Sequence, residues 1–547
     1  MSRRYILVLK FAGDDVEDLK MHIPKLEKGL FTSFILPLVF LGTVSAQIQV
    51  KTDGGALEGT TEGEIVSFKG IPFAAPPVGE LRWRAPQPAA AWSGVRKADH
   101  FGPSCVQFKA GERLPWTREF MVQNEISEDC LYLNIWTPRV GASVHLPVIV
   151  FIHGGGFTEG AGAVAIYDGT HLAAKGAVVV TINYRLGVFG FFAHPELTAE
   201  SAHHSSGNYG LLDQIAALQW VRTNIAAFGG DPRNVTIWGQ SAGAFSVGAL
   251  IASPLAAGLF HHAQADSGLG FASLPMLNLS EAEQNGIKFA MQHHAASLKE
   301  LRALPAESML PDPNDQVDGA LRFSPIVDGW ILPDTPNHMN ARGNDNDVAV
   351  ITGYQAGDPA LFFHPIPSLA DYHRMIREQY GDMAAEFDRL YPVTKESEIR
   401  NVMLISGQDR DRVSMFMWAR ERVRSHHQPV YTYFFDRAIP WPAHPEFGAF
   451  HSGEIPYFFV NLKLLDRPWE KEDYTLAGQV SSYLINFASK GNPNGSGLTE
   501  WPGVEATRPQ TMELGTHLGV MSLSDQEKRD FWIRYYHSPA SRKSPPF

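Results

Sequence analysis

The stretch NVTIWGQSAGAFSVGALI, residues 234–251, decides the fold. The run VTIW (235–238) is too short for a helix and is typical of a buried strand, whereas the residues after the motif begin a helical pattern. Gly239 and Gly243 leave room for a sharp turn with Ser241 at its centre. A serine on such a turn projects at the edge of the sheet, above a helix N-terminus that favours negative charge. The pattern therefore predicts a nucleophile, but a G-x-S-x-G string needs support from the rest of the chain.

Short β-branched runs recur along the chain and are typical of the buried strands of a parallel sheet; they lie at 147–152, 177–182, 235–238 and 348–352. Between the second and third runs, apolar residues recur at helical spacing at Leu211, Ile215, Leu218, Val221, Ile225 and Phe228. Strand, helix and strand in succession predict an α/β fold with a mainly parallel sheet and helices on both faces. We expect the segments 254–345 and 365–428 to be helical insertions over the carboxyl edge of that sheet.

The composition is that of a globular enzyme with a large core. The chain has 547 residues, of which 44% are hydrophobic and 19% are charged. Its net charge is −12, without long blocks of one sign, which argues against nucleic acid or an anionic membrane surface as the main partner. There is no internal repeat and no linker that divides the chain.

The N-terminal segment is typical of a secretory signal. From Met21 the chain has two lysines, an apolar run and then the small residues Val44-Ser45-Ala46. The run is short and contains Pro37, which disfavours a helix that spans a membrane. We therefore expect residues 1–46 to be an extension and signal peptide, with Met21 as the start. The mature chain, 47–547, would be one catalytic domain that is secreted or periplasmic and not stably inserted in the membrane. An uncleaved anchor is the alternative.

Export would place the two cysteines in an oxidising compartment, where a disulfide can form. Cys105 and Cys130 are the only cysteines of the chain, and in an oxidising compartment the simplest outcome is that they pair. A bridge of this length would stabilise the protein by roughly 3–4 kcal/mol in the loop-entropy model.

Partners for Ser241 appear elsewhere in the chain. The sequence HGGGF (153–157) follows a predicted strand, and its glycines allow backbone N–H groups to point into a cavity as an oxyanion hole. The acid and the base are expected in the order Ser, Asp or Glu, His. His451 follows the strand-like run VYTYFF (430–435), with His444 as runner-up, whereas His426 and His427 are expected at the surface. Asp358 follows a predicted strand, and Asp328 competes with it from a turn-like V-D-G setting.

At this point a resemblance is clear, and it covers nearly all of residues 48–540. The chain resembles the type-B carboxylesterases, which are α/β-hydrolases that include bacterial para-nitrobenzyl esterases and the cholinesterases. The matching stretches are FKGIPFAAPPVGELRW, SEDCLYLNIW, HGGGF, NYGLLDQ, FGGDPRNVTIWGQSAGA and GAFHSGEIPYFF.

The resemblance implies a role for individual residues. Ser241 would be the nucleophile, Asp358 the acid and His451 the base, and Gly155, Gly156 and Ala242 would supply the oxyanion N–H groups. It also implies a disulfide between Cys105 and Cys130, an ion pair between Arg82 and Glu128, and a supporting role for Ser267. Two positions depart from the family: the acid is Asp where Glu is usual, and Phe120 stands where cholinesterases carry the Trp that cradles choline, which disfavours a choline ester.

The implied function is hydrolysis of a small-molecule carboxylic ester through an acyl-enzyme, with no metal ion or organic cofactor. A lipase acting on longer acyl esters is the nearer alternative. A non-catalytic adhesion or binding protein of the same fold is the other, and the complete set of residues at 241, 358 and 451 argues against it.

Overall fold

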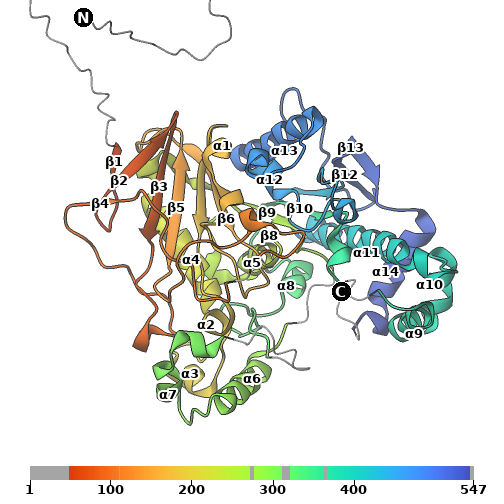
Figure 1. Ribbon diagram of the computed structural model, residues 1–547, viewed down its shortest axis with the longest axis horizontal. Helices are drawn as coiled ribbons and strands as arrows, with labels where there is room; N and C mark the ends of the chain where they lie inside the picture. Colours follow the sequence, from red (N-terminus) through yellow and green to blue (C-terminus); the bar gives the residue numbers. More distant parts are fainter. Residues whose placement is uncertain (1–47, 110, 272–275, 311–320, 363–365, 543–547) are drawn as a thin grey trace, which may run out of the picture. The chain divides into compact units, whose positions relative to one another are not determined.

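The protein is built on one large sheet, and its computed structural model describes residues 48–109, 111–271, 276–310, 321–362 and 366–542. The strands follow the order β1-β2-β3-β5-β7-β6-β8-β9-β10-β11-β12-β13, with β4 paired to β2 (Figure 1). From β7 to β12 neighbouring strands are parallel, and the antiparallel pairs lie at the two sides of the sheet. This is the α/β architecture with a mainly parallel sheet that the strand and helix pattern predicted, and it agrees with the fold that the resemblance implies.

The strands are β1 (Ile48–Lys51), β2 (Ala56–Glu62), β3 (Ile65–Pro72), β4 (Val95–Lys97), β5 (Tyr132–Thr137), β6 (Leu146–Ile152), β7 (Val178–Ile182), β8 (Gly230–Gln240), β9 (His262–Asp266), β10 (Ala349–Gln355), β11 (Val430–Phe435), β12 (Gln510–Leu514) and β13 (Leu518–Ser522). The α-helices are α1 (Thr170–Ala173), α2 (Gly187–Phe191), α3 (Pro195–Glu200), α4 (Tyr209–Asn224), α5 (Ala242–Ala252), α6 (Leu279–Gln292), α7 (Leu298–Ala303), α8 (Pro336–Arg342), α9 (Leu369–Tyr380), α10 (Ala384–Leu390), α11 (Glu396–Ser425), α12 (Ile455–Phe458), α13 (Lys471–Lys490) and α14 (Gln526–His537).

Strand β6 shows why the predicted strands are apolar throughout. Alternate side chains of a strand point to opposite faces of the sheet. Val148, Val150 and Ile152 belong to the core on the side of α4 and α5, whereas Ile149 and Phe151 belong to the core on the side of α12 and α13. All five are fully buried, because helices cover both faces.

Two details differ from the sequence-based expectation. The segment 254–345 is not only a helical insertion, because β9 lies within it and pairs with β8 and β10 in the centre of the sheet. The sequence HAQAD does not indicate a buried strand, because its buried Gln264 and Asp266 interrupt the apolar pattern. Helix α4 ends at Asn224, so Ile225 and Phe228 of the predicted apolar face lie in the 3₁₀ turn that follows it. The helix is buried around most of its circumference, and its Asp213 pairs with Arg185 at 2.7 Å.

The predicted helical segment 365–428 contains α9, α10 and α11. Together with α14 these helices enclose a third core of aromatic and aliphatic side chains, separate from those on the sheet, at the right of Figure 1. The long helix α11 also packs against β10 and β11, so it connects this helical layer to the sheet.

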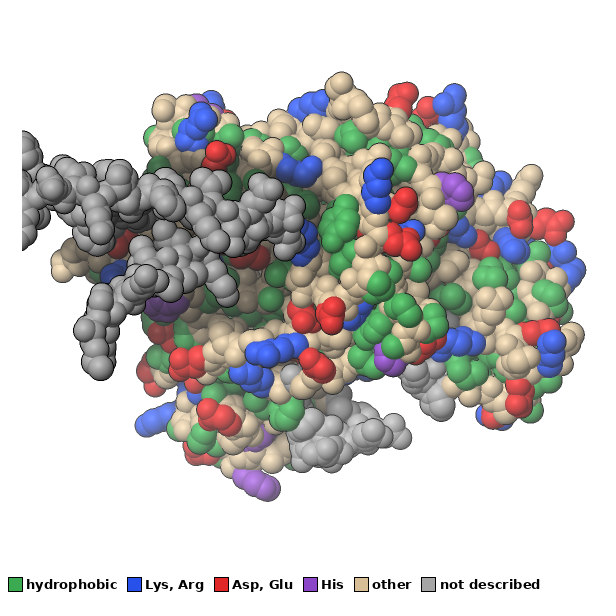
Figure 2. Space-filling view, turned by 45° about the horizontal axis from the view of Figure 1, so that its top comes forward, with side chains coloured by type: hydrophobic (Ala, Val, Ile, Leu, Met, Phe, Trp, Pro, Cys, Tyr) green, Lys and Arg blue, Asp and Glu red, His purple; other side chains and the backbone are tan. Residues whose placement is uncertain are grey.

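The residues described belong to one unit, Gln47–Phe547. Among its helices that the structure describes, none is long and apolar enough to cross a membrane. Acidic and basic side chains are interspersed over the face seen in Figure 2. The predicted signal peptide and its cleavage point at Ala46 lie outside the described residues.

The predicted ion pair between Arg82 and Glu128 is present and is bidentate, with Nε and Nη2 of Arg82 donating to the two carboxylate oxygens at 2.7 and 2.6 Å. The Nη1 group of Arg82 also donates to the carbonyl of Leu304 at 2.8 Å. The pair therefore attaches the segment after α7 to the N-terminal half of the sheet.

Candidate active site

Ser241 lies at the turn between β8 and α5, as the motif predicts. Its φ of 58° and ψ of −125° are rarely adopted by a residue with a side chain, so the turn is strained. The Ser241 N–H donates to the carbonyl of Asp266 on β9 at 2.9 Å, which anchors the turn to the neighbouring strand. Ser241 remains partly exposed, so a substrate can reach it.

The glycines of the motif allow strand and helix to approach each other. A Cβ atom at Gly239 would overlap the carbonyl oxygen of Gly243, and a Cβ atom at Gly243 would overlap the carbonyl oxygen of Ile152. Both overlaps involve backbone atoms, which cannot move aside. The packing of the turn therefore requires glycine at both positions.

Asp358 and His451 are in direct contact although 93 positions separate them. His451 lies on the loop before α12, and Asp358 follows β10 at the start of a 3₁₀ turn. The Nδ1 atom of His451 is 2.6 Å from Asp358 Oδ1. The other carboxylate oxygen accepts from Ser267 Oγ at 2.7 Å and from the N–H of Gln355 at 2.8 Å. Both oxygens of Asp358 are thus held in place, and the carboxylate orients the imidazole.

Asp328 and His444, the alternatives for the acid and the base, have other partners. Asp328 accepts hydrogen bonds from the N–H groups of Ile331 and Leu332 at 3.0 and 2.8 Å and from Ser205 Oγ at 2.6 Å, so it stabilises its own turn. His444 is half-exposed, with Nδ1 3.2 Å from Glu446.

The expectation that His426 lies at the surface is wrong. Its side chain is buried and contacts the Asp345 carboxylate, because Arg422 draws Asp345 into the interior between α11 and the segment before β10. His427 is exposed, as expected.

The glycine loop follows β6 directly. Gly155 and Gly156 have φ angles of 103° and 62°, which side chains rarely tolerate. In the part of the chain that the structure describes, the backbone N–H groups of Gly155, Gly156 and Ala242 donate to no other protein group. Free N–H groups near a nucleophile are what an oxyanion hole needs.

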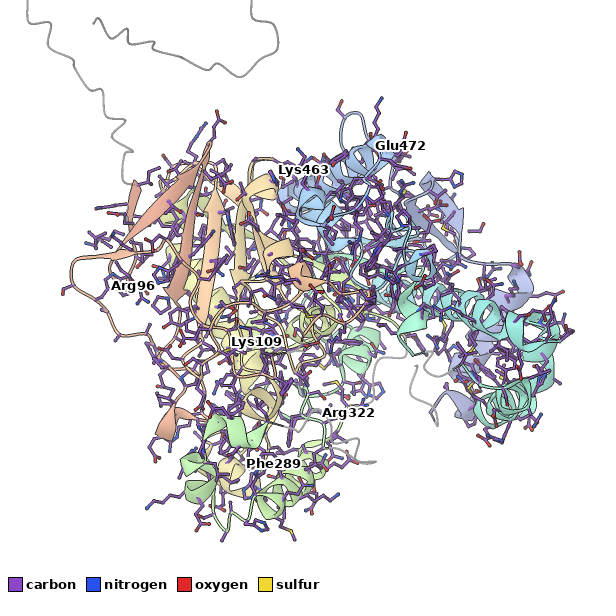
Figure 3. The ribbon with its side chains drawn as sticks, viewed as in Figure 1. Arg96, Lys109, Phe289, Arg322, Lys463 and Glu472 are labelled. Carbon is purple, nitrogen blue, oxygen red and sulfur yellow. A yellow bond between two sulfur atoms is a disulfide. The ribbon has the colours of Figure 1, made fainter. Side chains whose placement is uncertain are left out.

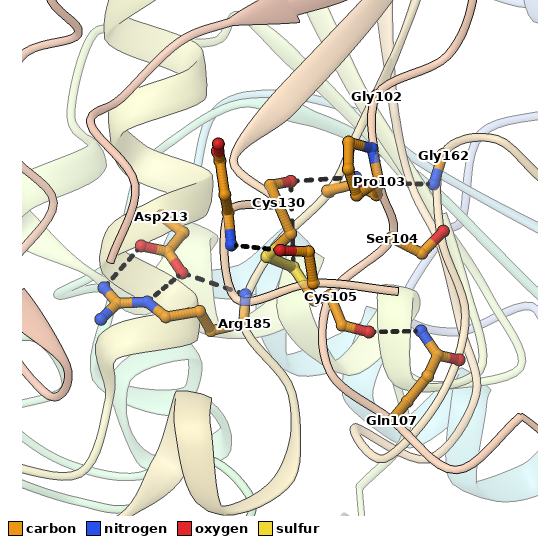
Figure 4. The surroundings of a disulfide bond; sticks show 12 residues. Gly102, Pro103, Ser104, Cys105, Gln107, Cys130, Gly162, Arg185 and Asp213 are labelled. Carbon is orange, nitrogen blue, oxygen red and sulfur yellow. Dashed lines mark hydrogen bonds and ion pairs between the residues drawn. A yellow bond between two sulfur atoms is a disulfide. The ribbon is translucent and has the colours of Figure 1, made fainter. Parts of the chain in front are cut away.

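The disulfide loop supports the glycine loop. The structure contains the expected bond between Cys105 and Cys130 (Figure 4). Gln107, two residues after Cys105, donates to the carbonyl of Gly160 at 2.9 Å and accepts from its N–H at 2.8 Å. Lys109, labelled in Figure 3, donates to the carbonyl of Gln123 at 2.9 Å and so joins the two arms of the loop.

Buried carboxyl groups lie behind Asp358. Asp266 is fully buried, and burial raises its pKa to about 6, although Trp238 Nε1 donates to it at 2.5 Å. Glu454 is also fully buried, and burial holds its pKa well above the usual value. The charges of Asp266 and Asp358 raise the pKa of Glu454 further, which favours its neutral form. Neither residue is expected from the sequence, because nothing in HAQAD or HSGE marks a buried carboxyl group.

An aromatic contact closes one side of the site. The rings of Phe120 and Phe450 are 5.9 Å apart in an edge-to-face arrangement, and Phe450 immediately precedes His451. Trp116 Nε1 is 3.5 Å from Ser452 Oγ, so the segment 116–120 contacts the loop of His451. Phe120, which the resemblance aligns with the choline-binding Trp of cholinesterases, thus packs beside the loop of His451.

In the described parts of the chain, no group of three or more His, Cys, Asp or Glu side chains is arranged to hold a metal ion.

Comparison with known proteins gives one consistent result. Residues 46–532 match the sequence profile of the Carboxylesterase family. The chain is 38% identical to the fumonisin B1 esterase of Sphingopyxis macrogoltabida, with 86% of each chain aligned. It is 36% identical to the para-nitrobenzyl esterase of Bacillus subtilis (strain 168), over 88% of this chain and 97% of that protein. A solved structure of a para-nitrobenzyl esterase superposes with a TM-score of 0.75 at 34% identity, and the match covers 88% of this chain and 99% of that chain.

Proposed function

The chain belongs to the carboxylesterase family and hydrolyses carboxylic ester bonds, and we propose that it does so through an acyl-enzyme formed on Ser241. The observation that carries this proposal is the contact between His451 and Asp358 beside the strained turn of Ser241. The protein acts on small-molecule esters, as its family does.

The mechanism has two steps. His451 Nε2 takes the hydroxyl proton as Ser241 Oγ attacks the ester carbonyl, and Asp358 stabilises the imidazolium that forms. The N–H groups of Gly155, Gly156 and Ala242 hold the negative oxygen of the tetrahedral intermediate. The imidazolium returns the proton to the leaving alcohol, and the ester of Ser241 remains. Water, activated by the same imidazole, then releases the carboxylic acid and restores Ser241.

Ser241→Ala tests the nucleophile. We expect turnover of p-nitrophenyl esters to fall by about 10⁴-fold or more. The melting temperature should be nearly unchanged, because alanine keeps the Cβ atom and the backbone conformation of the turn and loses only the hydroxyl group. A fluorophosphonate probe should label wild-type Ser241, located by peptide mapping, and should not label the variant. Retention of a tenth of the wild-type rate would place the nucleophile elsewhere.

The acyl chain of the substrate separates an esterase from a lipase. Esters with acyl chains from acetyl to palmitoyl, measured below and above their solubility limits, give the preference directly. We propose a preference for soluble esters, because two relatives are named fumonisin B1 esterase and para-nitrobenzyl esterase. A rate that rises only when the substrate forms an interface would favour the lipase alternative.

A further inference from the structure

The residue before the proposed nucleophile contacts the proposed base. Gln240 is the last residue of β8, and its side chain is buried at 2% exposure. Its Nε2 atom is 3.1 Å from His451 Nε2, the ring nitrogen that must take the proton of Ser241. Its Oε1 atom accepts from Ser452 Oγ at 3.1 Å. The amide therefore bridges His451 and the residue that follows it.

The protonation of the His451 ring determines which way the side-chain amide of Gln240 faces. Asp358 accepts only, so the contact at 2.6 Å places the proton of a neutral imidazole on Nδ1. The Nε2 atom then carries a lone pair and needs a donor, which the NH₂ group of Gln240 supplies. The amide oxygen is left to accept from the Ser452 hydroxyl, as observed. Every partner in the chain from Ser452 to Asp358 is satisfied in this one arrangement.

We propose that Gln240 is a positioning residue for His451: in the resting enzyme its amide donates to the one lone pair of Nε2 and holds the neutral ring in place, and this lone pair passes to the hydroxyl group of Ser241 when proton transfer begins. The inference rests on the proposed function, because the contact between Gln240 and His451 Nε2 affects catalysis only if this nitrogen takes the proton of Ser241.

The contact is specific for the neutral ring. When Nε2 receives a proton it becomes a donor, and the NH₂ group that faces it has no lone pair to offer. Gln240 therefore stabilises the neutral ring of the resting enzyme, which is the form that acts as a base.

Other ionisable groups near the ring do not supply this contact. Asp358 is on the opposite, Nδ1 side of the ring. Behind Asp358 lie Asp266 on β9, Glu454 on the loop of His451, and Asp411 on α11, whose carboxyl group interacts with that of Asp358. A change at Gln240 leaves all four groups in place, so its effect can be measured separately.

Gln240→Glu is the decisive variant, because it keeps the shape and replaces a donor by an acceptor with a negative charge. A carboxylate beside Nε2 favours the protonated ring. We expect the acid limb of the pH profile of kcat/KM to move to higher pH by about 1–2 units. The rate of fluorophosphonate labelling should show the same displacement, and this readout does not depend on the second chemical step.

Gln428→Glu is the matched control. Gln428 is exposed, just before β11, and the substitution adds the same charge away from the site. Its acid limb should coincide with that of the wild type. A Gln240→Glu profile that also coincides with the wild type, or that moves to lower pH, would overturn the proposal.

Two further variants keep the proposal testable if Gln240→Glu does not fold. Gln240→Met keeps the volume without the donor, and kcat should fall about tenfold with KM nearly unchanged, because the ring is no longer held. Ser452→Ala removes the donor that orients the amide and should give a smaller loss of kcat. Wild-type kcat in both variants would contradict a positioning role.

The Ser241→Ala variant separates the two proposals. If it is inactive while the Gln240 variants behave as the wild type, the inference fails and the proposed function stands. If Ser241→Ala remains active, the proposed function fails and the inference fails with it.

Discussion

Single residues show how one residue type takes different roles in this protein. Asp358 and Asp328 are both buried aspartates that accept several hydrogen bonds. The partners of Asp328 are backbone N–H groups of its own turn and a serine, whereas Asp358 also meets the Nδ1 atom of a histidine. The difference in partners, not in burial, makes Asp358 the candidate acid.

Asp358→Asn and Asp328→Asn should therefore have opposite effects. We expect Asp358→Asn to lower kcat by about 10³–10⁴-fold with folding retained, because the amide no longer favours the productive tautomer or stabilises the imidazolium. Asp358→Glu should be milder, since it supplies the same charge one methylene further out. Asp328→Asn should lower the melting temperature and leave kcat nearly unchanged. Measuring kcat with one ester and the melting temperature of each variant tests the assignment of Asp358 as the acid. If Asp328→Asn lowers kcat and Asp358→Asn does not, Asp328 is the acid instead.

At the scale of elements, the turn between β8 and α5 depends on backbone contacts that leave no room for a side chain. Gly243→Ala would place a Cβ atom against the carbonyl oxygen of Ile152, at the end of β6. We expect a loss of several kcal/mol of unfolding free energy, because a strand and a helix would have to separate.

Gly478→Ala is the control for that substitution. Gly478 lies in α13, and a Cβ atom there would have no neighbour within 4 Å. This variant should be as stable as the wild type or more stable by up to about 1 kcal/mol, because alanine favours helix. Urea unfolding of both variants measures the contrast, and equal stabilities would contradict the packing argument.

The disulfide loop belongs to the same scale, because it connects a covalent bond to the glycine loop through Gln107 and Gly160. The double variant Cys105→Ser, Cys130→Ser should lose roughly 3–4 kcal/mol of unfolding free energy. Its kcat should also fall, since Gly155 and Gly156 lose part of their support. Gln107→Ala, with the disulfide intact, should lower kcat without the large loss of stability. If kcat is unchanged in both variants, the loop stabilises the fold but does not organise the site.

At the scale of the whole molecule, export remains a proposal that rests on residues 21–46. We expect the mature protein to be secreted and to begin at Gln47, because the small residues Val44-Ser45-Ala46 follow an apolar run preceded by lysines. N-terminal sequencing of protein from the medium or periplasm gives the answer. A chain that keeps residues 30–46 and sediments with membranes would show the uncleaved anchor instead.

The sequence by itself determined the α/β class, the positions of the strands β6, β7, β8, β10 and β11, and the pairing of Cys105 with Cys130. These features have strong local signals: β-branched runs buried on both faces, a turn that tolerates only glycine at two positions, and a chain with only two cysteines. The sequence also proposed Ser241, Asp358 and His451 as catalytic residues, because the expected chain order of nucleophile, acid and base leaves few candidate residues for each role.

Only the tertiary structure decided what polar residues contact in the interior. It brought Asp358 rather than Asp328 to His451, buried His426 beside Asp345, and placed β9 in the centre of the sheet despite its polar residues. It also brought Gln240 to His451, 211 positions away. Hydrophobic burial follows a period that can be read along the chain, whereas a buried polar contact depends on which distant segment supplies the partner, and that is established only when the chain has folded.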